Sequence, residues 1–211
     1  MAIFIALLRG INIGGHHKIK MDALLKLCES LGFQSVQTYL QSGNVIFRSR
    51  DDNAARVSKK IQDAIERKAG FRIDVMLRTI TELREAIARN PFANRRGIEP
   101  NKFGLTFLEQ APSREQRENL LKLNITPEEL HLEGRELYIY FTNGMARPSF
   151  SPPVIERTLK TPGTTRNWNT VSKLLEIAEG MARGKDESRQ KAATGDSDSK
   201  QKRARKGIDR D

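Results

Sequence analysis

The sequence is short of cysteine and of long apolar runs. Cys28 is the only cysteine in 211 residues, as expected in a reducing compartment. No apolar run approaches the roughly 20 residues that a helix needs to cross a bilayer. The apolar segment 2–8 is too short for a signal peptide and has no basic region before it. We therefore expect a cytoplasmic protein without a membrane partner.

The sequence also has fewer acidic than basic residues: 26 Asp and Glu compared with 37 Lys and Arg, which gives a formal net charge of +11. Residues 181–211 share this basic balance and contain almost no large apolar side chains. Such a segment cannot offset the entropy lost on folding, so we predict a disordered basic tail there. Its KQKRARK run at 200–206 could add nonspecific affinity for nucleic acid, or it could serve only as a solubilising tail.

The whole chain is 37% hydrophobic and 30% charged, a composition typical of a globular protein with one core or two small ones. Its first part predicts a βαββαβ order, which is a ferredoxin-like unit. Apolar alternation and helical spacing place a strand at 3–8, a helix from 21 to Gly32, strands at 36–40 and 45–48, a helix at 54–68 and a strand at 73–77.

The second part repeats this order after a linking helix at 81–88. The expected elements are a strand at 103–107, a helix capped by Ser113, hairpin strands at 130–132 and 136–141, a helix at 151–159, a strand at 164–168 and a last helix from Asn169 to Gly180. The prediction is an α+β fold with two ferredoxin-like subdomains. They occupy residues 1–78 and 102–180, joined by the linking segment 79–101 and followed by the tail.

Three motifs interrupt these patterns with glycine, amide and hydroxyl residues. They are LLRGINIGG at 7–15, YLQSGNVIF at 39–47 and TTRNWNT at 164–170. Together with KIKM at 18–21, they resemble the signature of the domain of unknown function 1697 family, in the right order, over residues of about 1–180. The resemblance implies a bacterial cytoplasmic protein with two ferredoxin-like subdomains. It implies no activity.

The first motif offers groups suited to an anion. Backbone N–H groups around Asn12 and Gly14, with the ammonium groups of Lys18 and Lys20, precede a helix N-terminus, where phosphate is favoured. The spacing matches neither the P-loop nor the dinucleotide fingerprint. The alternative is a tight strand-to-helix connection whose glycines need positive φ.

The third motif adds Thr165, Arg166 and Asn167 just before the last helix. A guanidinium fork and free helix amides there could converge on a carboxylate or phosphate. We expect Arg166 at the surface, where its replacement would cost little stability.

The second motif contributes Gln41, Ser42 and Asn44, whose amide and hydroxyl groups could face a ligand. The alternative is an ordinary turn. We expect the three motifs to line one concave surface.

No nucleophile and base stand at a diagnostic spacing, so catalytic residues and a cofactor stay unassigned. His16, His17 and His131 lack further ligands at metal-binding spacing, so no metal site is expected. The leading hypothesis is binding of a phosphate-bearing partner, a nucleotide or nucleic acid. Against nucleic acid, the strand 44–47 lacks the basic-aromatic pattern that stacks bases. An enzyme acting on a small anionic substrate and a structural or interaction protein are the alternatives.

Overall fold

The structure is a computed structural model that describes residues 1–93, 95–146, 148–150 and 152–184. The chain forms two units, residues 1–178 and 179–211, and the first contains all the strands of the described residues. Most of the tail predicted at 181–211 lies outside the described residues. None of the described helices is long and apolar enough to cross a membrane.

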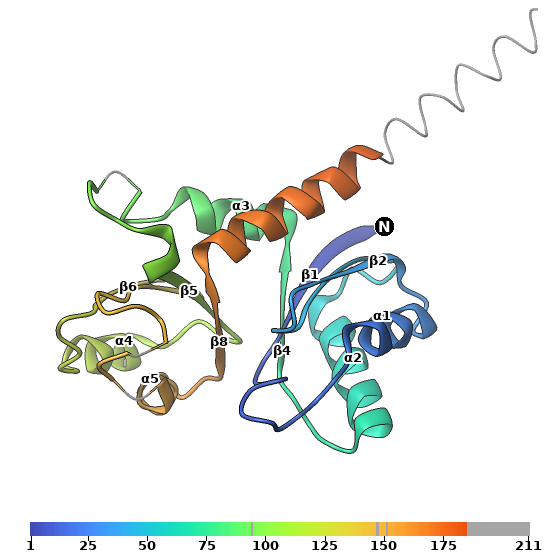
Figure 1. Cartoon of the computed structure of the whole chain (residues 1–211), viewed down its shortest axis with the longest axis horizontal. Coiled ribbons are helices and arrows are strands. Elements are labelled where there is room, and N and C mark those ends of the chain that lie inside the picture. Colours follow the sequence, from blue (N-terminus) through green and yellow to red (C-terminus); the bar gives the residue numbers. More distant parts are fainter. Residues whose placement is uncertain (94, 147, 151, 185–211) are drawn as a thin grey trace, which may run out of the picture. The chain divides into compact units, whose positions relative to one another are not determined.

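The first half of residues 1–178 has the predicted βαββαβ order (Figure 1). Its elements are β1 (Ala2–Leu8), α1 (Met21–Ser30), β2 (Gln34–Tyr39), β3 (Asn44–Ser49), α2 (Ala54–Ala69) and β4 (Val75–Thr79). The strands form one sheet in the order β2-β3-β1-β4, and all neighbours are antiparallel. The strand predicted at 73–77 begins two residues later than expected.

The second half repeats the same order after the linking helix α3 (Ile80–Ala88). Its elements are the 3-10 turn η1 (Pro100–Lys102), β5 (Phe103–Leu108), α4 (Arg114–Leu121), β6 (Glu129–Glu133), β7 (Glu136–Tyr140), α5 (Pro152–Leu159) and β8 (Gly163–Asn167). The sheet order is β6-β7-β5-β8, again antiparallel throughout. The prediction of an α+β fold with two βαββαβ halves is therefore confirmed.

Helix ends show where local sequence rules held and where they did not. Ser113 and Gln116 form the predicted capping box at α4. The last helix was predicted from Asn169 to Gly180, but residues 168–184 are helical, so both predicted ends were wrong. Its cap is Asn167, whose side-chain oxygen accepts a hydrogen bond from the Asn169 N–H at 2.9 Å, so the prediction that Asn169 is the cap was wrong. Gly180 does not end the helix, since a lone glycine costs a helix only about 1 kcal/mol relative to alanine.

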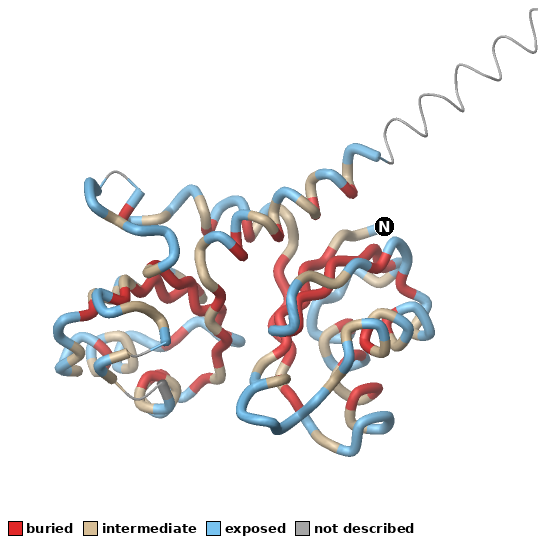
Figure 2. The backbone as a smooth tube through the Cα atoms, in the orientation of Figure 1, coloured by how far each residue is buried: buried red, intermediate tan, exposed pale blue. Residues whose placement is uncertain are grey.

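Each sheet buries one face beneath its own helices. In the first half, Leu24 of α1 and Ile61 of α2 pack on a sheet face that includes Phe4 and Phe47. In the second half, the apolar cluster below α4 and α5 includes Leu120 and Ile155 among its buried members. Figure 2 shows that the buried residues gather along the strands of both sheets. The helix-covered faces therefore supply two separate cores, as the amphipathic patterns predicted.

The opposite sheet faces are also buried, and a charged pair lies between the halves. The Nε of Arg78 on β4 donates to the Glu136 carboxylate on β7 at 2.9 Å, and its side chain is 1% exposed. The same guanidinium donates to the Leu108 carbonyl oxygen at 2.9 Å and lies over the Phe107 ring. Burial is the main cause that lowers the pKa of Arg78, and the Glu136 charge opposes it.

Replacing Arg78 with Leu should lower the free energy of unfolding by about 3–5 kcal/mol, because the Glu136 carboxylate then stays buried without its partner. Urea unfolding followed by circular dichroism measures the change. The control is Arg114→Leu, which removes an ion pair with Glu118 from a side chain that is 93% exposed and should shift the midpoint little. Equal midpoints for the two variants would contradict a stabilising role for the Arg78 contact.

Candidate functional site

The three polar motifs meet at the side chain of Arg166 on β8. Its Nε donates to the Asn44 side-chain oxygen at 2.6 Å. Its Nη2 donates to the carbonyl oxygens of Leu8 at 2.7 Å and Ser42 at 3.0 Å. The third motif therefore reaches both the end of β1 and the turn between β2 and β3, which lie more than a hundred residues earlier in the chain.

Arg166 is buried, so the expectation of a surface arginine was wrong. Its Nη1 donates to the Thr164 hydroxyl at 2.6 Å and to the Thr165 carbonyl at 3.0 Å. A guanidinium has five N–H groups, and all are occupied by these acceptors. Every acceptor is neutral, and burial lowers the pKa of Arg166 to about 10. The side chain therefore has no donor left for a ligand, but it keeps a positive charge that none of these acceptors neutralises.

The amides of Asn12 and Asn44 also bond to the chain itself. Asn12 adopts a positive φ of 57°; its oxygen accepts from the Ile19 N–H at 2.9 Å and its Nδ2 donates to the Gln41 carbonyl at 2.8 Å. The Asn44 Nδ2 donates to the Tyr39 carbonyl at 2.7 Å. These two amides therefore hold the 10–20 loop and the β2–β3 turn in place.

The structure divides the predicted site residues into two groups. Ser42, Thr165 and Arg166 line a cavity between the two halves. The residues that do not line it are Asn12, Gly14, Lys18, Lys20, Gln41, Asn44 and Asn167. Lys18 and Lys20 are exposed, and the Asn167 side chain bonds to the Asn101 carbonyl at 2.9 Å while it caps the last helix.

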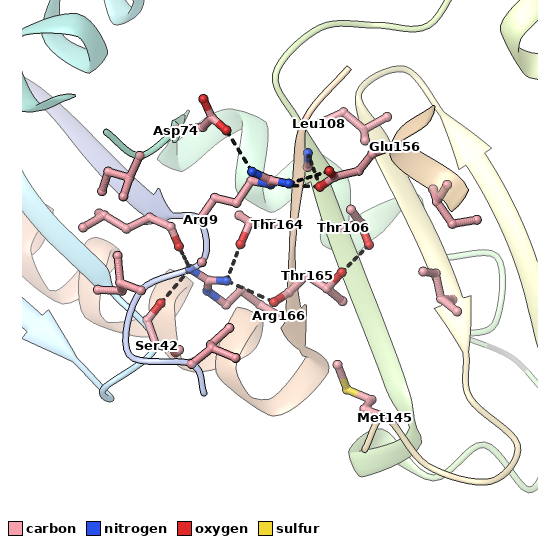
Figure 3. Close-up of a pocket in the computed structure, with 18 of the residues that line it drawn as sticks. Arg9, Ser42, Asp74, Thr106, Leu108, Met145, Glu156, Thr164, Thr165 and Arg166 are labelled. Atoms are coloured by element: carbon pink, nitrogen blue, oxygen red, sulfur yellow. Dashed lines mark hydrogen bonds and ion pairs between the residues drawn. The ribbon is translucent and has the colours of Figure 1, made fainter. Parts of the chain in front are cut away.

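The cavity has a volume of about 870 Å³ and is lined by residues of both halves. Figure 3 shows its polar groups. The hydroxyls of Thr106 on β5 and Thr165 on β8 lie 2.7 Å apart, within hydrogen-bond distance. Most of the wall is apolar. The apolar side chains from the second half are Leu108, Ile139, Phe141, Met145, Ala146, Pro148, Phe150 and Ile155.

Sequence reasoning missed a set of ion pairs that joins the halves beside this cavity. We call these contacts of Arg9 with Glu156 and Asp74 the charged clamp. Arg9, directly after β1, donates through Nε and Nη2 to the two carboxylate oxygens of Glu156 on α5. Its Nη1 donates to Asp74 at 3.2 Å, and the hydrogen bond with Glu156 is the main cause that raises the pKa of Arg9. Arg9 lies inside the first motif, so position alone could have suggested it. Nothing local in the sequence singles out Asp74 or Glu156.

Arg166 is the arginine at the cavity that has no carboxylate partner among the described residues. The lining contains the three arginines Arg9, Arg72 and Arg166 and the two carboxylates Asp74 and Glu156, and Arg72 pairs with Glu66 outside the lining at 3.2 Å. Arg9 uses three of its N–H groups on Asp74 and Glu156, so two of the five have no partner in the described part of the chain and can bind a ligand. The buried charge of Arg166 is weakly screened by solvent, because low-dielectric surroundings strengthen its electric field. The cavity can therefore hold an apolar group and attract a negative one.

The chain belongs to the family described as Protein of unknown function (DUF1697), whose model matches residues 1–138. The match ends before the motif at 164–170, short of the 1–180 expected from the resemblance. Among solved structures, the chain is similar to the conserved bacterial protein SP0830 from Streptococcus pneumoniae, with 22% identity, a TM-score of 0.64, and coverage of 84% of this chain and 98% of that chain. This likeness establishes the fold alone. No curated protein matches the chain.

Arg166→Lys should lower the free energy of unfolding by at least about 2 kcal/mol, because an ammonium has three donors and leaves buried carbonyl oxygens unpaired. Chemical unfolding of the purified variants measures this. Arg157→Lys is the matched control, since Arg157 is exposed on α5 and should tolerate the change. A small, equal effect of both substitutions would show that the buried arginine does not hold the motifs together.

Proposed function

We propose that this protein binds a small organic anion, of about the size of a nucleotide, in the cavity between its two halves. The observation that carries the proposal is the buried charge of Arg166, which meets only neutral acceptors at the cavity wall. A volume of about 870 Å³ lies within the range of known small-molecule sites, which are mainly apolar with a few polar groups. An anion would gain from the Arg166 field without displacing any of its hydrogen bonds.

A nucleotide is favoured over nucleic acid by the kind of surface that the cavity offers. Binding along a nucleic-acid strand needs an open basic groove with successive stacking platforms. The cavity instead has a mainly apolar wall from β5, β7, α5 and the 141–150 segment. The exposed Lys18 and Lys20 of the first motif do not line it. Nucleic-acid binding is therefore an outcome of the test and not the leading proposal.

Binding is also favoured over catalysis. Among the described residues that line the cavity, Asp74 and Glu156 carry the carboxylates, and both accept hydrogen bonds from Arg9. His17 also lines the cavity, and its Nδ1 lies 3.3 Å from the Gly10 carbonyl oxygen. A general base must lie within hydrogen-bond reach of the proton that it removes, whereas Arg9 holds both oxygens of Glu156 and one oxygen of Asp74 in ion pairs. These carboxylates are better suited to orient Arg9 than to transfer protons.

Calorimetric titration with adenosine 5′-monophosphate, nicotinate, ribose 5-phosphate and succinate tests the proposal. At least one of these anions should bind the parent protein. Arg9→Gln should weaken that binding about tenfold, because a hydrogen bond to a charged group contributes about 1.5–3 kcal/mol. Arg157→Gln is the charge-matched control, since Arg157 follows Glu156 on the same helix, is exposed and does not line the cavity.

Equal affinities of the Arg9→Gln and Arg157→Gln variants would place the ligand outside the cavity. No binding of any of the four anions would contradict the proposed function. If only a single-stranded oligonucleotide binds, nucleic acid replaces the small anion as the partner. Turnover of a bound anion into a product would favour the enzyme alternative.

A further inference from the structure

One part of the cavity wall combines a hydroxyl pair with aromatic and sulfur-containing side chains. We call it the inner chamber and define it by Thr106, Phe141, Met145, Phe150 and Thr165, all of which line the cavity. The rings of Phe141 and Phe150 are stacked, with centroids 6.1 Å apart and an interplanar angle of 22°. Aromatic rings and a methionine sulfur are favourable neighbours for another ring.

The hydroxyl pair has one hydrogen to spare. Two threonine hydroxyls carry two hydrogens in total, and the bond between Thr106 and Thr165 uses one of them. Among the residues that the structure describes, no other acceptor is bonded to either hydroxyl. The second hydrogen is therefore available to a hydrogen-bond acceptor inside the cavity. If this hydrogen were absent, an acceptor that entered the apolar chamber would lose its hydrogen bonds to water and gain none from the protein.

Close packing of the strands holds the chamber in shape. A Cβ added to Gly104 on β5 would lie 2.9 Å from the Phe141 ring and 3.0 Å from the Thr165 methyl group. Glycine at this position therefore lets Phe141 and Thr165 approach the strand together. The chamber is preformed, which lowers the entropy that a ligand loses on binding.

The charged clamp lies next to the chamber. The backbone N–H of Gly163 is 3.3 Å from a carboxylate oxygen of Glu156, and a Cβ at Gly163 would lie 2.9 Å from the Thr106 methyl group. Gly163 therefore lies between the hydroxyl pair and the Arg9–Glu156 contact and is a neighbour of both. Figure 3 shows the two groups on neighbouring parts of the same wall. One small molecule can reach both.

We propose that the inner chamber recognises a ring that bears a hydrogen-bond acceptor, as part of the same anion whose negative group stays near Arg9. The acceptor takes the spare hydrogen of the Thr106–Thr165 pair, and the ring packs against Phe141, Met145 and Phe150. This inference rests on the proposed function and names its ligand class, namely ring-bearing anions such as nucleoside monophosphates or heteroaromatic carboxylates. Sugar phosphates and aliphatic acids, which have no aromatic ring, are poor ligands.

The test on the full chain compares anions that bear an aromatic ring, called ring-bearing, with anions that have no aromatic ring, called ring-free. Adenosine 5′-monophosphate, uridine 5′-monophosphate and nicotinate form the first set, and ribose 5-phosphate, inorganic phosphate and succinate form the second. The best ring-bearing anion should bind at least about tenfold more tightly than any ring-free one, since burying a ring contributes more than 1.4 kcal/mol.

A matched pair of double variants then isolates the hydroxyls. Thr106→Val with Thr165→Val replaces both partners of one hydrogen bond by groups of the same shape, so stability should change little. Its affinity for the best ring-bearing anion should fall at least about fivefold, because the ligand acceptor is left unpaired. Thr106→Ser with Thr165→Ser keeps both hydroxyls and should retain most of the affinity. The exposed Thr81→Val controls for threonine replacement elsewhere.

Each outcome separates this inference from the proposed function. Equal binding of ring-free and ring-bearing anions, or unchanged affinity in the valine double variant, would overturn the inference and leave anion binding standing. Loss of affinity in both double variants alike would also overturn it, because packing and not the hydroxyls would then decide the affinity. If neither set binds the parent protein, the proposed function and the inference are both wrong.

Discussion

The hydrogen bonds of one buried guanidinium, that of Arg166, join the two βαββαβ halves. Arg166 leaves the edge strand β8 of the second half and donates to carbonyl oxygens at the end of β1 and in the β2–β3 turn of the first. Gly43 lets the β2–β3 turn pack against the end of β1, since a Cβ there would lie 2.5 Å from Ile11 and 2.9 Å from Leu8. The three motifs that were expected to line one concave surface therefore first hold the two halves together, and their amide and carbonyl groups surround the Arg166 cation in place of water.

The neutral contacts of Arg166 have an electrostatic consequence for the cavity beside it. A buried ion pair such as Arg78–Glu136 cancels most of its own field, but Arg166 has only neutral partners. Its charge is therefore felt by whatever occupies the neighbouring space. Arg9 adds free N–H groups at the same cavity, held in place by two carboxylates. The bonds that join the halves thus also shape and charge the space between them.

Much of the fold could be read from local sequence. Periodic apolar residues located the helices and strands to within a few residues, and the Ser113 capping box marked the start of α4. The errors came where a tertiary contact or an alternative cap outweighed a local signal. Asn167 caps the last helix although Asn169 has the same side chain, since β8 ends at Asn167. Arg166 was expected at the surface because one strand seen alone cannot show that another half covers it.

The sequence by itself determined the element order and the three motifs, because hydrophobic periodicity and turn chemistry act over a few neighbouring residues. Only the tertiary structure decided which way those polar groups face. Asn12, Asn44 and Arg166 bond inward. Residues with no local signature, among them Thr106, Glu156 and Phe141, complete the cavity that Ser42 and Thr165 of the motifs also line. The reason is physical: a buried polar group must find partners, and for Arg166 those partners lie more than a hundred residues away in the chain.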